Sequence, residues 1–193
     1  MPKQVDAAAQ RSEIRHAARR VFSRQGVEGT GLTHVAREAG MGRSSLYHYY
    51  PDKQSLLRDL VQKLLDDELE VFLGVLRGSG DPRHRVEQLA RSLVALFHEY
   101  AAAFRMAADL RVRDAAQFKV FFRKVRSEFA AVIEEGQEQG VFDKGLAPAL
   151  TASVLIGAID GLLLQYFADG RAFPALDVLG EEVVRIARKA LAA

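Results

Sequence analysis

Five side chains between residues 43 and 48 have the chemistry that DNA recognition requires. They are Arg43, Ser44, Ser45, Tyr47 and His48. An arginine can pair bidentately with guanine O6 and N7, and serine hydroxyls can bond a phosphate or a base edge. Tyr47 and His48 carry rings with polar atoms that could reach phosphate oxygens or a thymine methyl group. These residue types in one short run indicate a surface that reads DNA.

The residues before this run predict a short helix followed by a tight turn. We expect Thr30 to cap this helix, because a threonine side chain can accept a hydrogen bond from a free N–H group of the first turn. Apolar residues then recur at the spacing of one helical face, at Leu32, Val35, Ala36 and Ala39. Gly40 and Gly42 mark the turn, since glycine readily adopts the left-handed conformation. Met41 between them is the residue that can point into a core.

A second short helix would carry the polar run on its outer face. Leu46 and Tyr50 lie one turn apart and should face inward, which leaves the other side chains free to enter the major groove. Four further residues could support the contact: Thr33, His34, Tyr49 and Lys53. The first two would flank the groove from the preceding helix, and the last two would hold phosphates. A helical hairpin with a solvated face remains the alternative interpretation of the pattern alone.

Residues 11 to 57 resemble the N-terminal signature of the TetR family of bacterial transcriptional regulators. The matching residues are Thr30, Val35, Ala36, Ala39, Gly40, Met41, Leu46, Tyr47, His48, Tyr49, Tyr50, Lys53, Leu56 and Leu57. The chain departs from the signature at three positions. Gly42 stands where the family usually has a capping serine or threonine, Ser44 where it has glycine, and Tyr50 where it has phenylalanine. Because Ser44 would face the groove, the operator sequences of relatives do not transfer to this chain.

The resemblance implies an all-α fold with two domains. Residues 1–53 would form a three-helix, helix-turn-helix DNA-binding head, and residues 54–193 a larger effector-binding and dimerisation domain. The implied function is a sequence-specific transcriptional regulator, most simply a repressor that releases a palindromic operator on binding a hydrophobic small molecule. The alternative is a helical-bundle small-molecule binding protein or enzyme that does not bind DNA.

Composition and charge agree with this interpretation. The 193 residues include five prolines and no cysteine, so neither a disulfide nor a thiolate metal site can form, which fits a reducing cytoplasm. Residues 1–53 hold nine Lys and Arg against five Asp and Glu, a net charge of +4 that favours contact with phosphates. We expect no signal peptide and no membrane span, because no uninterrupted apolar run is long enough.

The residues argue against catalysis and against a bound metal. The sequence contains no Gly-x-Ser-x-Gly, no phosphate-cradling glycine loop and no metal-spaced cluster among its five histidines. Glu13 and His16 form a single Glu-x-x-His pair, whereas di-iron bundles need two copies on facing helices. We therefore predict no enzymatic activity and no cofactor.

The rest of the chain predicts further helices. An amphipathic helix over residues 12–25, anchored by Phe22 and ended by Gly26, should pack across the motif, and residues 1–9 should form a mobile arm. A long helix from Asp52 would break between Gly74 and Pro82. Later helices are expected over residues 82–104, 114–139, 147–167 and 181–191.

Aromatic residues crowd two of these helices. They include Phe97, Tyr100, Phe104, Phe118, Phe121 and Phe122. Rings line ligand cavities as readily as they fill cores, so the residues alone leave both interpretations open. The family resemblance favours an effector site built from them.

The last two helices predict a homodimer. Residues 147–167 are apolar nearly all round, which indicates a helix that other protein surfaces must cover. Packed with the final amphipathic helix on the same pair of a second copy, it would form a four-helix bundle about a two-fold axis. The expected interface comprises Leu155, Ile159, Leu162, Val183 and Ile186. Asp160, the one acid in this run, should be paired with an arginine or a backbone donor, unless it contacts a ligand.

Overall fold

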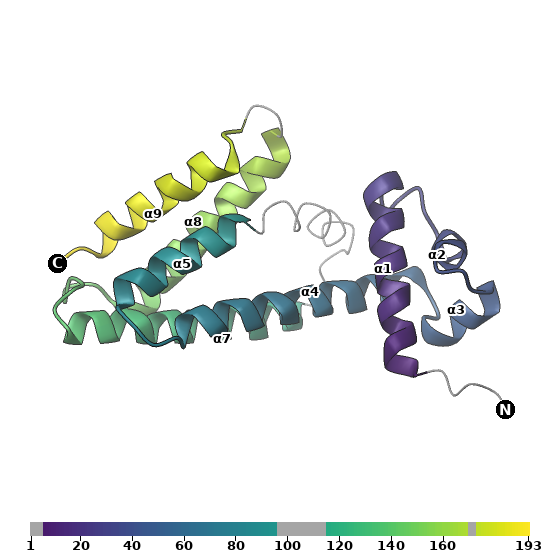
Figure 1. Ribbon diagram of the computed structural model, residues 1–193, viewed down its shortest axis with the longest axis horizontal. Helices are drawn as coiled ribbons and strands as arrows, with labels where there is room; N and C mark the ends of the chain where they lie inside the picture. Colours follow the sequence, from purple (N-terminus) through teal and green to yellow (C-terminus); the bar gives the residue numbers. More distant parts are fainter. Residues whose placement is uncertain (1–5, 96–114, 170–172) are drawn as a thin grey trace. The chain divides into compact units, whose positions relative to one another are not determined.

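The computed structural model describes residues 6–95, 115–169 and 173–193, and every regular element in these ranges is a helix (Figure 1). The helices are α1 (Ala7–Gln25), α2 (Leu32–Glu38), α3 (Arg43–Tyr49), α4 (Lys53–Leu76), α5 (Pro82–Ala95), α7 (Ala115–Glu138), α8 (Pro148–Asp169) and α9 (Leu176–Leu191). The expected all-α fold is confirmed. The chain divides into two compact units within α4, after Leu64. The domain boundary after residue 53 stays a prediction.

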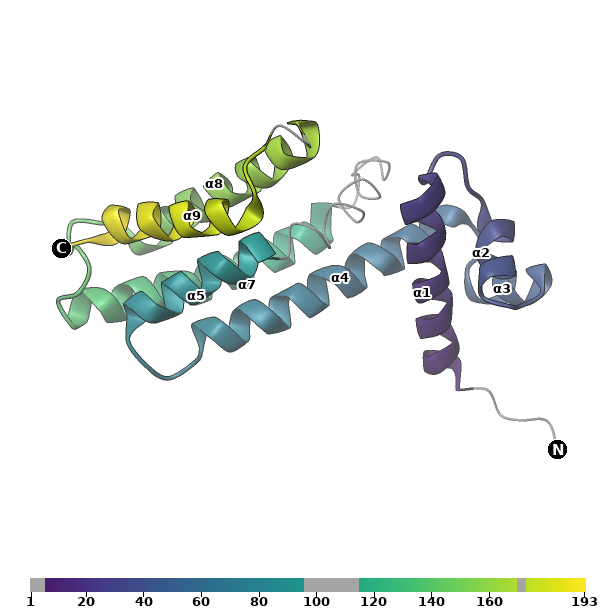
Figure 2. The same ribbon diagram turned by 45° about the horizontal axis from the view of Figure 1, so that its top comes forward.

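Helices α1 to α3 and the start of α4 share one apolar core. The face that α1 buries is the predicted one, Ile14, Ala17, Ala18, Val21 and Phe22. It packs with Val35 of α2, Leu46 of α3 and Leu56 of α4 in a single cluster. Figure 2 shows α2 and α3 on the same side of α1. These contacts give the first unit the predicted three-helix head.

Helix α1 begins earlier than the sequence indicated. The side chain of Asp6 accepts a hydrogen bond from the N–H of Ala8 at 2.9 Å, which caps the helix and makes Ala7 its first residue. The prediction of a mobile arm was therefore wrong for residues 7–9. At the other end, Gly26 terminates α1 with a φ of +75°, as expected.

The prediction that Thr30 caps α2 was wrong, because Gly31 occupies the cap position. The Thr30 hydroxyl instead lies 2.7 Å from the carbonyl oxygen of Gly26, and the residue is buried. Its oxygen therefore closes the loop between α1 and α2 rather than the first turn of α2. The ring Nδ1 of His34 serves as the cap acceptor, taking a hydrogen bond from the Gly31 N–H at 3.1 Å.

The turn between α2 and α3 has the predicted geometry. Gly40 adopts a φ of +64°, and the next N–H, that of Met41, donates to the Ala36 carbonyl at 3.0 Å. Met41 packs against the core of the first unit. This left-handed glycine closes α2 and reverses the chain within three residues, which sets the direction in which α3 leaves the turn.

In the second unit, α5 packs against α9 and α7 against α8. Figure 2 shows α9 running alongside α5. Two ion pairs join these helices, Arg91 with Glu181 and Arg188 with Glu87. The helix ends differ from the prediction in two places: Gly74 lies inside α4, which continues to Leu76, and α9 begins at Leu176 rather than at residue 181.

The two differences have physical reasons. Gly74 is exposed and a Cβ there would meet nothing within 4 Å, so the helix passes through it at the modest cost of an internal glycine. In α9, Leu179 and Gly180 are buried, and Leu179 packs in the same core cluster as Val94 of α5. That burial holds the first turn of α9 in helical form.

Replacing Gly136 in α7 with alanine should destabilise the protein, although alanine is the better helix former. A Cβ at residue 136 would lie 2.0 Å from Cδ2 of Phe142, which is buried. The resulting displacement should lower the free energy of unfolding by about 1–3 kcal/mol, measured by urea denaturation. The matched control, Gly74→Ala in α4, should raise it by up to about 1 kcal/mol. Equal stabilities of the two variants would contradict this packing.

Candidate functional site

Helix α3 presents the predicted polar run to solvent. Leu46 is fully buried and Tyr50, just after the helix, is 2% exposed, so both face inward as expected. The exposed residues are Arg43, Ser44, Ser45, Tyr47 and His48. Gly42 is the N-cap and adds no side chain there. One face of α3 therefore carries a cation, two hydroxyls and two polar rings with nothing covering them within the described chain.

Arg43 and Tyr47 interact with each other on this face. They are four residues apart, and the guanidinium carbon lies 5.4 Å from the centre of the tyrosine ring. Together with Ser44 they line an open hollow on the surface. A cation held over an aromatic face loses some of its rotamer freedom before binding. The stack therefore prepares the guanidinium fork for a planar partner such as a guanine edge.

The remaining predicted contact residues are placed less simply. Thr33 is exposed on α2, and His34 is half-buried because its ring caps that helix. Tyr49 is half-buried too, with its ring edge-to-face against His48 at 5.8 Å and the Arg11 guanidinium 5.9 Å from its centre. The sequence interpretation missed Arg11, which lies on α1. A direct DNA contact by any of these residues stays a prediction.

Lys53 has a structural role that its sequence position did not reveal. Its ammonium donates to the carbonyl oxygens of Val27 at 3.0 Å and Thr30 at 3.2 Å. Two of its three N–H groups therefore fasten the α1–α2 loop to the start of α4, and one remains for another acceptor. The predicted phosphate contact would have to use that third group.

Glu38, the acid of α2, pairs with two arginines of α1. Glu38 accepts hydrogen bonds from Arg20 and Arg24 of α1, and these bonds hold its pKa below the ordinary value. Because this carboxylate is paired, it opposes an approaching phosphate less than a free acid would. On the outer face of α3, no described residue forms an ion pair with Arg43.

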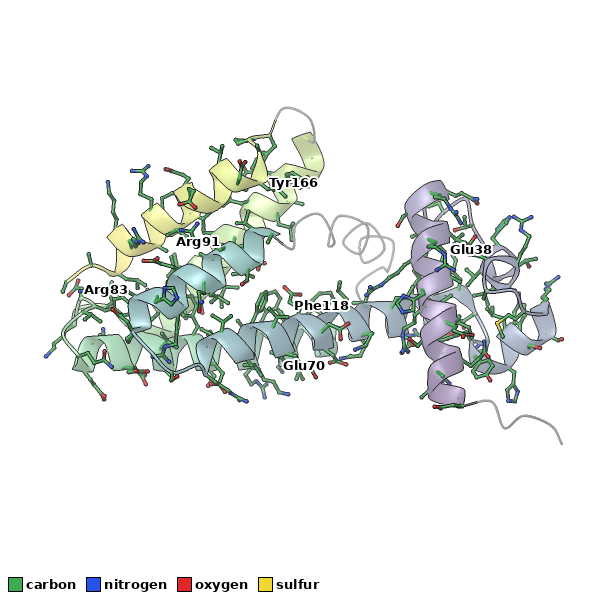
Figure 3. All side chains as sticks on the ribbon, in the orientation of Figure 1. Glu38, Glu70, Arg83, Arg91, Phe118 and Tyr166 are labelled. Atoms are coloured by element: carbon green, nitrogen blue, oxygen red, sulfur yellow. The ribbon has the colours of Figure 1, made fainter. Side chains whose placement is uncertain are left out.

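The predicted effector residues are only partly described. Phe97, Tyr100 and Phe104 lie outside the described residues. Phe121 is buried, with its ring centre 6.3 Å from that of Phe72 in α4 and 5.3 Å from that of Phe122. Phe118, labelled in Figure 3, is half-buried one turn before Phe122 on α7. The second unit thus brings two of the six predicted rings, Phe121 and Phe122, together with Phe72 of α4.

A half-buried acid lies beside these rings. Glu68 precedes Phe72 by one turn on the inward face of α4, and burial together with the nearby Asp160 raises its pKa to about 8. Asp160 on α8 is exposed as a residue, but protein atoms around its carboxyl raise its pKa to about 6. The sequence analysis expected a paired Asp160, but no described residue forms a hydrogen bond or ion pair with its carboxyl, and burial alone accounts for its raised pKa.

The predicted dimer residues gather in the second unit. They line, with neighbours from α5 and α7, an apolar cavity of about 90 Å³. Val183 is buried, Leu155, Ile159 and Leu162 are half-buried, and Ile186 is 52% exposed. Their place in an interface stays a prediction.

Helix α8 is not covered on every side in the single chain. Leu150 and Val154 are 66% and 61% exposed. Among the described helices, the segment Pro148–Tyr166 is long and apolar enough to cross a membrane by length and composition. The sequence analysis expected no such segment. Core helices of soluble proteins meet the same two criteria. In the single chain this apolar face of α8 is left exposed.

The first unit is a helix-turn-helix closed by a glycine, and its second helix exposes an arginine and hydroxyls. Helix α4 joins it to a helical second unit. These features define a DNA-binding regulator. Residues 14–60 match the family model "Bacterial regulatory proteins, tetR family" and residues 82–193 match "BetI-type transcriptional repressor, C-terminal". The chain belongs to the TetR family of transcriptional regulators.

Individual relatives agree with this assignment. The regulator BetI of Rhizobium meliloti (strain 1021) is 30% identical over 169 residues, which cover 86% of this chain and 81% of BetI. A TetR/AcrR regulator from Thermobifida fusca superposes with a TM-score of 0.79 at 19% identity, covering 93% of this chain and 97% of that chain. FadR of Bacillus subtilis, solved in complex with stearoyl-CoA, superposes with a TM-score of 0.71 at 18% identity, covering 93% and 98%.

Glu68 predicts a dependence of stability on pH. Its folded pKa of about 8 lies above the ordinary value of 4.5, so the stability that Glu68 contributes is fully present below pH 4.5 and is lost as the pH rises to about 8. The free energy of unfolding, measured by urea denaturation at pH 8, should therefore be higher for Glu68→Gln than for the parent by on the order of 2 kcal/mol. At pH 5 the two free energies should be closer. Glu70→Gln, on the exposed face of the same helix, is the control. A difference between parent and Glu68→Gln that stays constant from pH 5 to 8 would contradict the assignment.

Proposed function

We propose that this regulator is a homodimeric repressor that places α3 in the major groove of a palindromic operator. The observation that carries the proposal is the exposed face of α3, on which Arg43 is stacked over Tyr47 beside two serines. In this arrangement Arg43, Ser44, Ser45, Tyr47 and His48 contact bases or adjoining phosphates. Thr33 and His34 flank the groove, and Tyr49 and Lys53 lie toward the backbone.

The second copy would cover α8 and α9. In the single chain Leu150, Val154 and Leu164 leave a long apolar face exposed on α8, and α9 adds Ile186. A two-fold arrangement of these helices buries the same face of both copies in one four-helix bundle. It also fixes the separation of two DNA-binding heads, which is the geometry that selects two half-sites of inverted sequence.

The effector would be a hydrophobic small molecule bound in the second unit, near Phe118, Phe121 and Phe122, with Phe97, Tyr100 and Phe104 as further contacts. The ring cluster at Phe72 and Phe121 supports this location. The stearoyl-CoA complex of FadR supports the ligand class, because that protein has the same fold. Helix α4 belongs to both units, so a ligand that prefers one orientation of α4 would change the spacing of the heads and release the operator.

The cellular location of the protein follows from its proposed binding to DNA. A protein that binds chromosomal DNA acts in the bacterial cytoplasm, where its cysteine-free sequence needs no oxidising environment. No catalytic step and no cofactor enter the proposal.

Arg43→Ala should abolish specific DNA binding. Loss of a bidentate base contact costs about 1–3 kcal/mol per head, so a dimer should lose about 30-fold or more in affinity for a duplex that the parent protein enriches from a random-sequence pool. Fluorescence anisotropy at fixed salt measures the change. Arg123→Ala, which removes an exposed cation from α7, is the charge-matched control and should bind like the parent. Unchanged affinity in Arg43→Ala would refute the proposed reading surface.

Glutamate at an exposed apolar position of α8 or α9 should convert the dimer to a monomer. Val154→Glu and Ile186→Glu each place two charges in the proposed two-fold interface, where desolvation strongly opposes association. Light scattering after size-exclusion chromatography reports the mass. Val120→Glu introduces the same change at an exposed valine of α7, and it should remain dimeric. If Val154→Glu and Ile186→Glu both kept the mass of a dimer, as Val120→Glu should, the interface would lie elsewhere.

A further inference from the structure

A buried polar contact ties the end of the recognition helix to α4. The Tyr50 hydroxyl donates a hydrogen bond to Oδ2 of Asp59, and Nη1 of Arg15 donates to the same oxygen at 3.1 Å. One carboxylate oxygen of α4 therefore receives a donor from the residue that follows α3 and another from α1. All three residues belong to the first unit.

The contact is well suited to setting orientation. Tyr50 is 2% exposed, and the Arg15 and Asp59 side chains are 19% and 32% exposed, so water competes weakly for these bonds. Burial and then the bond to Asp59 raise the pKa of Tyr50 to about 12, above an ordinary value that already leaves the hydroxyl protonated at neutral pH. The guanidinium of Arg11 lies 5.1 Å from the centre of the same ring and limits its movement.

Apolar packing alone fixes α3 poorly. Leu46 is the single buried residue among the seven of this helix. Tyr49 and the ring of Tyr50 also pack against the same core, but dispersion contacts are not directional and so fix the rotation of the helix weakly. A charge-assisted hydrogen bond is both stronger and directional. The bond from the Tyr50 hydroxyl, placed directly after the last turn, adds the directional contact that this apolar packing lacks.

We propose that Asp59 is a positioning residue for DNA recognition, which holds α3 and α1 in register on α4 through Tyr50 and Arg15. This inference rests on the proposed function of α3. The family signature that this chain resembles usually has phenylalanine at the position of Tyr50, and phenylalanine lacks the hydroxyl. Since α4 continues into the second unit, the same contact makes α3 follow any reorientation of the first turns of α4.

Tyr50→Phe and Asp59→Asn test the proposal with a duplex enriched by the parent protein and a scrambled duplex of equal length. Tyr50→Phe removes the hydroxyl but keeps the ring in the core. It should bind the enriched duplex about five- to tenfold more weakly and the scrambled duplex within about twofold of the parent, since one directional hydrogen bond is lost. The readout is the ratio of the two affinities, which a general loss of stability does not change.

Asp59→Asn separates position from charge. Removing a negative charge near DNA would, by electrostatics alone, strengthen binding to both duplexes. The proposal instead requires weaker binding to the enriched duplex. Glu13→Gln removes an exposed acid from α1 that bonds only locally with Gln10, and it provides the charge control.

Three outcomes would overturn the inference. The first is an unchanged affinity ratio in Tyr50→Phe, and the second is equal DNA binding by Asp59→Asn and Glu13→Gln. Either would mean that the contact stabilises the fold but does not position α3 for DNA. A parent protein that enriches no sequence would refute the proposed function, and the inference would fall with it. The first two leave the reading role of Arg43 intact, so the two failures are distinguishable.

Discussion

The DNA-reading surface depends on the burial of one apolar face of α1. Helices α2 and α3 have seven residues each, far below the length at which an isolated helix is stable in water. They exist because Val35 and Leu46 are buried against Ile14, Ala18 and neighbours in a shared core. The exposed polar run on α3 is thus a consequence of apolar residues on another helix.

Helix α4 carries one acid in each unit, and the two acids have different surroundings. Its first turns carry Asp59, whose carboxylate collects donors from Tyr50 and Arg15. Its later turns carry Glu68, an acid beside aromatic rings that would be destabilising if fully ionised. One continuous helix therefore contributes a directional polar contact to the reading head and a strained acid to the second unit.

The sequence predicted the elements well where local pattern determines structure. The apolar stripe of α1, the left-handed Gly40 and the inward Leu46 and Tyr50 all follow from periodicity and backbone sterics, and the structure confirms them. The errors arose where tertiary contacts decide. Thr30 has the chemistry of a cap, but its hydroxyl bonds a carbonyl of the preceding loop. Gly74 suggested a break, yet the surrounding turns continue as a helix.

The candidate site shows the same division. Exposure of Arg43 and the serines follows from helical spacing, whereas the hydrogen bonds of Lys53 to Val27 and Thr30 join residues more than 20 positions apart and leave no mark in the sequence. The proximity of Glu68 on α4 to Asp160 on α8 likewise joins residues far apart in the sequence. Long-range polar pairs of this kind cannot be read from periodicity, because many side chains could satisfy each one.

The symmetry of the DNA that the protein selects tests the central claim most directly. Purified protein would be equilibrated with a pool of random duplexes at low salt, without added ligand, and the bound fraction sequenced. Two heads related by a two-fold axis should enrich inverted repeats whose half-site centres lie about 10 base pairs, or a multiple of that distance, apart. Enrichment of single or directly repeated sites, or of no sequence at all, would contradict the account.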